Sequence, residues 1–281
     1  MKKNILFYAF CVFISVVFAV ACAKDSSTAD ANPSNTGTGG STARFSIVGD
    51  YLYTVDDKNL KVFSISDPAV PAFLGTIPIG VGIETIFSLN DNLLIGSSDG
   101  MYIYNIAQPQ TPILLTKYTH IRQCDPVVAN DSIAFVTLRT AAEGSSCRAV
   151  TWGPTNVLEV VNIRDRSNPT LIKRYNMTNP YGLGIDENLL FICDAGVLRV
   201  MDISNPYTGV PQIASLSINL NDVIPLGGHL LAVGDDAVYD IDYTEPTNMR
   251  IVAKLKRSNS NGFVNPNTPT EGGKPFVFRR N

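Results

Sequence analysis

The sequence predicts an all-β protein built from about five repeats, each of which folds as four short strands. Short segments rich in Val, Ile, Leu and Tyr follow one another along the chain, separated by Asp, Asn, Gly and Pro, which leaves no room for a long helix. One motif recurs five times in register. It returns after about 40 residues, with one longer unit, and such a period is typical of repeat architectures.

The recurring motif is the third strand of each repeat together with the turn that follows. It begins with alternating apolar residues, passes a polar residue and then Ile or Tyr, and ends in Pro. Its five copies are LKVFSISDP (60–68), MYIYNIAQP (101–109), LEVVNIRDRSNP (158–169), LRVMDISNP (198–206) and VYDIDYTEP (238–246). The closing prolines are 41, 60, 37 and 40 residues apart, so only the third repeat contains an insertion.

Two strands precede each copy of the motif and one follows it. The second strands are expected at 51–55, 92–96, 132–136, 188–192 and 229–233, and the first strands at 44–48, 85–89, 125–129, 181–185 and 222–226. Four strands in a unit of about 40 residues are typical of a β-propeller blade. We therefore expect one β-propeller domain over residues 43–281, with about five four-stranded blades. A sixth blade, or ring closure by the tail around Lys274 to Arg280, is left open.

The repeats also resemble those of the LVIVD-repeat family, over roughly residues 44 to 257. The resemblance is specific because the motif occurs five times in register and not only once. It implies a propeller-type fold and a setting outside the cytoplasm, and it implies no particular activity.

The N-terminus predicts a lipoprotein signal peptide over residues 1–21. Lys2 and Lys3 precede an apolar run, Ile5 to Ala21, in which Ser15 is the single polar residue, and small residues end the run. The sequence Ala-Val-Ala-Cys then predicts cleavage before Cys22 and lipidation of its thiol. An ordinary signal peptide or an uncleaved anchor helix is the alternative, although 17 residues lie at the lower limit for a membrane span.

Residues 22–42 are expected to be the lipidated cysteine and a flexible linker, because the segment contains almost no apolar side chains. Ala23, in place of Asp, favours the outer membrane by resemblance to known lipoprotein sorting. Lys24-Asp25 resembles, faintly, the surface-export signals of Bacteroidota lipoproteins. We therefore expect an outer-membrane lipoprotein, facing the periplasm or exposed at the cell surface.

The charge balance argues against nucleic acid as a partner. Without residues 1–21 the chain has 20 basic and 25 acidic residues, hence a net charge near −5 and no basic footprint. The expected contacts are the membrane, through the lipid, and an unknown protein or small polar ligand. We expect a monomer.

Strand direction places a candidate site on one face of the ring. In a four-stranded meander, the start of the innermost strand and the loop between the second and third strands lie on the same side. The innermost strands begin near Arg44, Glu84, Asp125, Tyr181 and Asp222, which should surround one mouth of the central channel. The insertion, residues 140–155, is a loop on the same side and contains Trp152, the single tryptophan. We call this side the insertion face.

Three interpretations of these residues remain open. The mouth residues could simply pair with one another, Arg44 neutralising a neighbouring acid. Glu84, Asp125 and Asp222 could converge as oxygen ligands of calcium, which would be the one bound ion expected. Finally, Arg44, Tyr181 and the acids could hold a polar ligand or partner, with Trp152 as an apolar anchor. The other acids of these loops, Asp56, Asp57, Asp99, Asp194, Asp235 and Asp236, are expected to form turns.

The cysteines predict one disulfide. Cys124 begins the third repeat and Cys147 lies in the insertion on the same face, so a Cys124–Cys147 bridge could fix the insertion beside the mouth. Cys193 is then expected to be a buried free thiol, although pairings with it stay possible.

A binding protein is the favoured functional class, and an enzyme is the alternative. No G-x-S-x-G, H-E-x-x-H or phosphate-binding glycine motif occurs, and the two histidines, His120 and His229, belong to opposite faces. We assign no catalytic residue. A hydrolase or lyase with a site at the channel mouth remains the competing hypothesis, because propeller enzymes assemble their sites from distant blades. We expect the insertion face to bind a ligand or partner.

Overall fold

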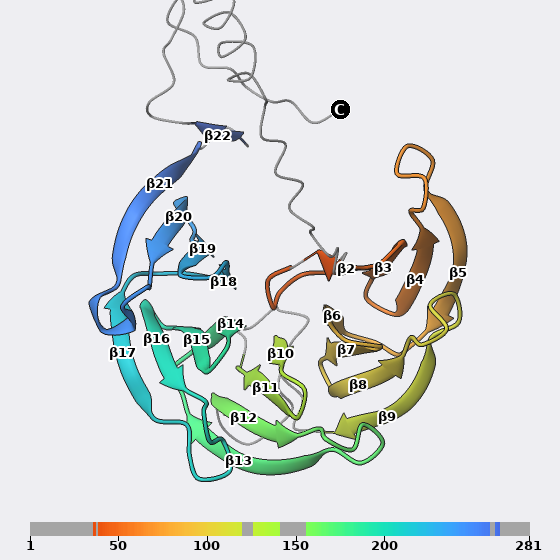
Figure 1. Cartoon of the computed structure of the whole chain (residues 1–281), viewed down its shortest axis with the longest axis horizontal. Coiled ribbons are helices and arrows are strands. Elements are labelled where there is room, and N and C mark those ends of the chain that lie inside the picture. Colours follow the sequence, from red (N-terminus) through yellow and green to blue (C-terminus); the bar gives the residue numbers. More distant parts are fainter. Residues whose placement is uncertain (1–35, 38, 120–125, 141–155, 259–261, 265–281) are drawn as a thin grey trace, which may run out of the picture. The chain divides into compact units, whose positions relative to one another are not determined.

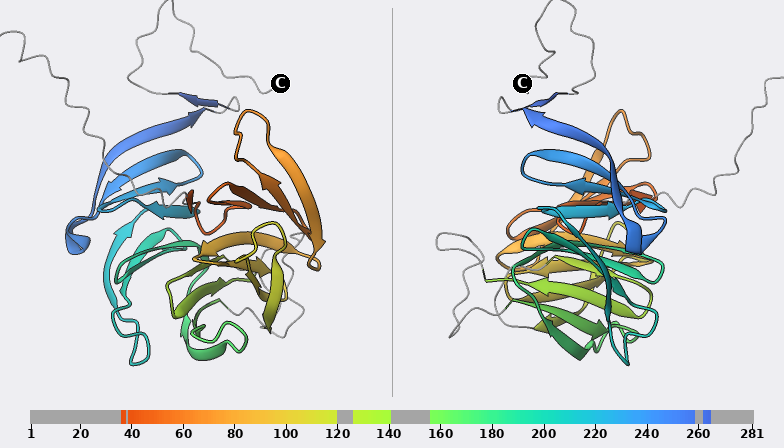
Figure 2. Two further views of the ribbon diagram at one scale, coloured as in Figure 1. Left: turned by 45° about the vertical axis from the view of Figure 1, so that its right-hand side comes forward. Right: turned by 90° about the vertical axis from the view of Figure 1, so that its left-hand side faces the viewer.

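A computed structural model describes residues 36–37, 39–119, 126–140, 156–258 and 262–264. These residues form five antiparallel sheets of a five-bladed β-propeller, arranged around a common axis (Figures 1 and 2). A single 3-10 turn, η1 (Pro246–Asn248), is the only helix among them. No helix in the described part of the chain is long and apolar enough to cross a membrane.

The strands follow the order expected from the repeats, with the first strand innermost and the fourth outermost (Figure 1). The first strands are β2 (Phe45–Val48), β6 (Ile83–Leu89), β10 (Val127–Ala129), β14 (Pro180–Asp186) and β18 (Asp222–Pro225). The second strands are β3 (Tyr51–Val55), β7 (Asn92–Ser97), β11 (Ile133–Leu138), β15 (Leu189–Asp194) and β19 (His229–Val233). The third strands are β4 (Asn59–Ser64), β8 (Gly100–Asn105), β12 (Val157–Asn162), β16 (Val197–Asp202) and β20 (Ala237–Asp242). The outer strands are β5 (Ala72–Pro78), β9 (Ile113–Thr119), β13 (Thr170–Asn176), β17 (Gln212–Ser217) and β21 (Arg250–Ser258).

Two short strands extend the first and last blades. β1 (Thr36–Gly37) pairs with β2 at the inner edge of blade one, and β22 (Gly262–Val264) pairs with β21 at the outer edge of blade five. The prediction of about five four-stranded blades is therefore confirmed. The tail that includes Lys274 to Arg280 lies outside the described residues.

The recurring motif is explained by what its polar residue does. In every repeat, a side chain at the end of the third strand accepts a hydrogen bond from the backbone N–H two residues later: Ser64, Asn105, Asn162, Asp202 and Asp242. Such a bond stabilises the turn that follows the strand. The Ile or Tyr that comes next donates its backbone N–H to the loop between the first two strands, in the pairs Ile65–Asp50, Ile106–Asp91, Ile163–Ser132, Ile203–Asn188 and Tyr243–Gly228.

Neighbouring blades pack through apolar side chains that alternate along the strands. One buried cluster fills each interface from blade one to blade five, and Figure 2 shows the sheets stacked on edge in side view. In the second strand of blade two, for example, Leu93 and Ile95 pack against blade one, whereas Leu94 packs against blade three. Successive side chains of a strand point to opposite faces, so this continuous apolar strand is buried against both neighbouring blades.

Candidate functional site

The insertion face is formed as the topology predicts, by the starts of the inner strands and the loops between second and third strands. Arg44 lies one residue before β2, Glu84 is the second residue of β6, Tyr181 is the second residue of β14, and Asp222 begins β18. Asp125 and Trp152 lie outside the described residues, as do Cys124, Cys147, His120 and residues 141–155. The predicted disulfide and the apolar role of Trp152 therefore stay predictions.

Asp222 binds the segment that leads into blade one. Its Oδ1 accepts from the hydroxyl of Ser41 at 3.0 Å and from its neighbour Val223 N–H at 3.0 Å. Its Oδ2 accepts from the N–H of Thr42 at 3.1 Å and from the Thr42 hydroxyl at 2.6 Å. The Ser41 hydroxyl oxygen in turn accepts from the N–H of Leu183 in blade four, at 2.7 Å. Asp222 thus joins blades one, four and five at the centre of the ring.

Two glycines make room for the Asp222 carboxylate. A Cβ atom built on Gly40 would lie 2.1 Å from Asp222 Oδ2, and one built on Gly182 would lie 2.2 Å from Oδ1, so neither position accepts a larger residue without a shift. Asp222 is 8% exposed, and this burial raises the pKa of its carboxyl above the ordinary value. Gly40 and Ser41 are buried as well, so the packed part of the chain extends a few residues into the stretch expected to be linker.

The other mouth residues contact their immediate neighbours. Arg44 is exposed, and its guanidinium donates to the carbonyl of Ile83 at 3.1 Å, beside Glu84 at the start of blade two. Tyr181 is half-buried, and its ring lies under the guanidinium of Arg139, 4.3 Å from Cζ to the ring centroid. Its hydroxyl accepts from the side chain of Asn179 at 3.3 Å. The structure therefore brings Arg44 toward Glu84, and Tyr181 toward the beginning of the insertion.

Arg139 is a residue that the sequence analysis did not select. It is the last residue but one before the undescribed part of the insertion, and its Nε is buried without a hydrogen-bond partner in the described structure. A cation over an aromatic ring is attracted by about 0.5–1 kcal/mol at exposed sites and more when desolvated. The sequence places Arg139 directly before the insertion, but its contact with Tyr181 in the next blade depends on the fold.

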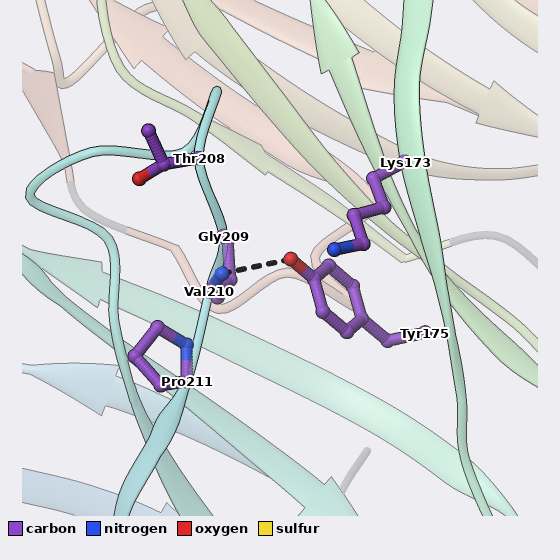
Figure 3. Close-up of a pocket in the computed structure, with 6 residues that line it drawn as sticks. All are labelled: Lys173, Tyr175, Thr208, Gly209, Val210 and Pro211. Atoms are coloured by element: carbon purple, nitrogen blue, oxygen red, sulfur yellow. Dashed lines mark hydrogen bonds between the residues drawn. The ribbon is translucent and has the colours of Figure 1, made fainter.

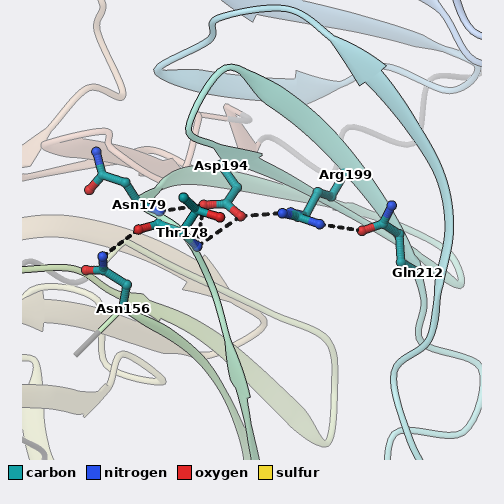
Figure 4. A network of polar contacts seen from close by, with 6 residues as sticks. All are labelled: Asn156, Thr178, Asn179, Asp194, Arg199 and Gln212. Atoms are coloured by element: carbon teal, nitrogen blue, oxygen red, sulfur yellow. Dashed lines mark hydrogen bonds and ion pairs between the residues drawn. The ribbon is translucent and has the colours of Figure 1, made fainter. Parts of the chain in front are cut away.

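A polar network fixes the two ends of the insertion to blade four (Figure 4). Asn156, on the far side of the insertion, accepts from the N–H of Thr140 at 3.0 Å and donates to the carbonyl of Thr178 at 2.6 Å. The N–H groups of Thr178 and Asn179 donate to the buried carboxylate of Asp194, at 3.0 and 2.7 Å. Arg199 Nε completes the network with an ion pair to Asp194 at 2.8 Å and a second bond, from Nη1 to Gln212.

Four of the remaining acids of these loops accept hydrogen bonds or form ion pairs with nearby residues. Asp56 accepts from the N–H groups of Lys58 and Asn59 and pairs with Lys61. Asp99 and Asp236 pair with the lysines of the adjacent outer strands, Lys117 and Lys254, and Asp235 accepts from Asn221. No group of three or more metal-ligating side chains occurs among the described residues. The calcium hypothesis includes Asp125, which lies outside them, so it stays a prediction.

A shallow pocket lies on the opposite side of the ring, between blades three and four (Figure 3). It is lined by Lys173 and Tyr175 of β13 and by Thr208–Pro211, in the loop before β17. The hydroxyl of Tyr175 accepts from the N–H of Val210 at 2.7 Å, as Figure 3 shows. This bond links the two segments that line the pocket. The loop that lines it connects a third strand to an outer strand, β16 to β17, so the pocket does not belong to the insertion face.

Comparison with known proteins supports the interpretation of the repeats. The family model described as LVIVD repeat matches residues 39–77 and 182–208, which fall in blades one and four. No curated protein matches the sequence.

Several solved structures are similar in fold. A functionally unknown protein from Desulfotomaculum acetoxidans DSM 771 superposes with a TM-score of 0.59 at 8% identity, over 82% of this chain and 71% of that one. A protein from Lactobacillus plantarum gives 0.57 at 12% identity, over 73% and 67% of the two chains. The complex of KlAtg21 with the coiled coil of AgAtg16 gives 0.54 at 14% identity, over 75% and 68%. At such identities the likeness shows the fold alone.

Proposed function

We propose that this chain is a lipid-anchored protein of the cell envelope, and that its propeller binds a ligand or protein partner through the insertion face. The anchor would be Cys22, and the linker after it would let the propeller turn toward its partner. The insertion, residues 140–155, would make the specific contact, with Trp152 as its apolar anchor.

The observation that carries the proposal is the attachment of the insertion. Both of its ends are held, one through Arg139 stacked on Tyr181 and the other through Asn156 bonded to Thr178. The network reaches the buried carboxylate of Asp194, which belongs to the rigid core of blade four. A loop carried by a rigid base loses less conformational entropy on binding than a loop with free ends. Variable loops on a rigid scaffold are also where binding residues concentrate.

The fold is compatible with this role. One of the similar propellers is a complex with a coiled coil, which indicates that a propeller can hold a protein partner. The described part of the insertion face carries both signs of charge and an aromatic ring, in Arg44, Glu84, Arg139 and Tyr181. A site with a few convergent polar groups beside apolar surface suits a polar ligand or a protein surface.

Replacement of residues 141–154 by a short Gly-Ser linker tests the binding face. The network around Thr140 and Asn156 is retained, so we expect unchanged thermal unfolding and loss of partner capture from envelope extract. Tyr207→Ala, which changes an exposed side chain in a loop on the opposite face, is the matched control and should capture the partner normally. Recovery of the same partner by the linker variant would refute the insertion face as the binding surface.

Cys22→Ser tests the anchor independently of the binding face. We expect the unaltered protein to enter the detergent-rich phase on phase separation and the variant to remain in the aqueous phase. Mass analysis of the mature N-terminus should show a diacylated cysteine. An unmodified Cys22, or equal partition of both proteins, would refute lipid attachment while leaving the binding experiment valid.

A further inference from the structure

The interface between blade five and blade one differs from the other four. The described residues form four apolar clusters between blades, and none of these clusters joins blade five to blade one. At the centre of the ring the two blades are linked through the polar contacts of Asp222, and farther out the ribbon diagram shows their sheets apart (Figure 1). We call this interface the seam.

On the side of blade five that faces the seam, apolar side chains are exposed at positions that the other blades bury completely. The middle position of the second strand, which faces the next blade, is 0% exposed in the other four repeats, where it is occupied by Tyr53, Leu94, Phe135 and Phe191. In blade five the same position is Leu231, which is 39% exposed. Val238, in the third strand, is partly exposed where the equivalent residues Leu60, Met101, Leu158 and Leu198 are all 0% exposed.

Blade one shows the same pattern on its side of the seam. Leu52 is partly exposed, whereas its equivalents facing the previous blade, Leu93, Ala134, Leu190 and Leu230, are all 0% exposed. Phe63 is also partly exposed, and its ring contacts that of Phe73, at 5.4 Å between centroids. Phe45, on the innermost strand, is 52% exposed. Apolar side chains thus line both sides of the seam, and burying them would be favourable.

Blade five also carries an acid in the seam. Asp240 occupies the third-strand position that holds Val62, Ile103, Val160 or Val200 in the other blades, each at most 1% exposed. It pairs with His229 at 2.8 Å, and both side chains are more than 40% exposed. An occupant of the seam should therefore be apolar on both sides, and a positive charge on it would have Asp240 as an acidic partner beside His229.

We propose that the C-terminal segment, residues 265–281, occupies the seam. It continues from β22, which Figure 1 places at the edge of blade five that borders the seam. Its 17 residues can extend over roughly 56 Å, which is ample to cross a seam between two sheets. It contains Pro275-Phe276-Val277-Phe278, followed by Arg279 and Arg280.

The order of these residues fits an extended segment between two apolar surfaces. Successive side chains of an extended chain point to opposite sides, so Phe276 and Phe278 would pack on one blade and Val277 on the other. A strand buried on both faces is a continuous apolar run, in contrast to the alternating pattern of a half-buried strand. The arginines supply the charge that Asp240 would attract. The segment would complete the ring, and it would cover the apolar surface of the seam, as an apolar cluster does at each of the other four interfaces between blades.

A photo-reactive benzophenone side chain at position 278 of the full chain tests this placement directly. We expect intramolecular cross-links to peptides that contain Leu52, Phe63, Leu231 or Val238. The matched control carries the same group at position 268, nearer the start of the segment, and should give few seam cross-links. Cross-links that fall elsewhere on the ring, or cross-linked dimers joined at the seam, would overturn the proposal, the latter because a second copy would then be the occupant.

A double variant, Phe276→Ser with Phe278→Ser, gives a second readout. We expect binding of an apolar-surface dye to rise about twofold or more, because the seam becomes accessible, and hydrogen exchange in β4 and β20 to accelerate. Thr268→Ser with Thr270→Ser in the same segment should change neither. Equal dye binding by the double variant and the unaltered chain would overturn the proposal. Leu231→Asp should reproduce the dye signal without any change in the tail.

Discussion

Replacement of Asp222 by Ala should loosen the centre of the ring. The change removes the acceptor of four hydrogen bonds, two of which come from buried donors, the Ser41 hydroxyl and the Val223 N–H. A buried donor left without an acceptor costs about 1–3 kcal/mol. Thr42 is exposed, so water replaces its two bonds at little cost.

The two orphaned donors together set the size of the effect. Their sum is about 2–6 kcal/mol, and release of a desolvated carboxylate offsets part of it, so we expect a loss of about 3 kcal/mol in the free energy of unfolding. In a domain of this size, 1 kcal/mol shifts the melting temperature by about 2–4 °C. Asp222→Ala should therefore melt about 6–12 °C below the unaltered protein, as followed by circular dichroism. Asp235→Ala, at an exposed acid of the same blade, is the control and should melt almost unchanged.

The pH dependence provides a check on the same carboxylate. Because burial raises the pKa of Asp222, the folded state binds more protons than the unfolded state at pH values between the ordinary and the raised pKa. The contribution of Asp222 to stability therefore falls as pH rises through this window. The difference in unfolding free energy between the unaltered protein and Asp222→Asn should shrink over the same range. A melting temperature for Asp222→Ala within 2 °C of the unaltered protein, in the same buffer, would refute the reasoning.

Three further predictions concern buried groups elsewhere in the ring. Gly182→Ala should cost about 1–3 kcal/mol, because the new Cβ would lie 2.2 Å from Asp222 Oδ1 and 2.7 Å from a backbone carbonyl, whereas Gly75→Ala, with open space around it, should be nearly neutral in denaturant unfolding. Arg174→Ala should cost about 2–3 kcal/mol in the same assay, because it leaves the fully buried Glu159 carboxylate without its ion pair; equal stability of this variant and Lys173→Ala would contradict that account. Cys193 should resist alkylation until the protein unfolds, because it is 1% exposed and burial raises the pKa of its thiol; rapid labelling of the native protein, followed by mass mapping, would argue against this burial.

The strands were predictable because the same pattern of apolar and turn-forming residues occurs in all five repeats. A polar cap at Asn105 or Asp202 followed by Ile is a local signal, since the side chain bonds a backbone group two residues away. The alternation of Leu93, Leu94 and Ile95 likewise reflects burial on both faces of one strand. Such features depend on neighbours in sequence, so the blade number and strand order follow from the sequence.

The centre of the ring was not predictable in the same way. Asp222 was selected as a mouth residue, but its partners Ser41 and Thr42 lie about 180 residues earlier and were assigned to the linker. Their role depends on closure of the ring, which brings the two ends of the propeller together, and no local pattern encodes such a contact. Arg139 was missed for the same reason, because its significance arises from the position of Tyr181 in the next blade.

Differences between the repeats are more informative about function than their likeness. The turn caps recur in all five blades because every blade needs the same turn, whereas the starts of the inner strands vary, with Arg44, Glu84, Tyr181 and Asp222 in four of the blades. Asp222 has a structural role that only one blade can perform, joining the last blade to the segment before the first. Arg44 is exposed and donates to one backbone carbonyl, Tyr181 is half-buried beneath Arg139, and both lie on the face from which the insertion projects. Because these two side chains are much less buried than Asp222, substitutions of Arg44 and Tyr181 should affect binding more than folding, the reverse of the expectation for Asp222.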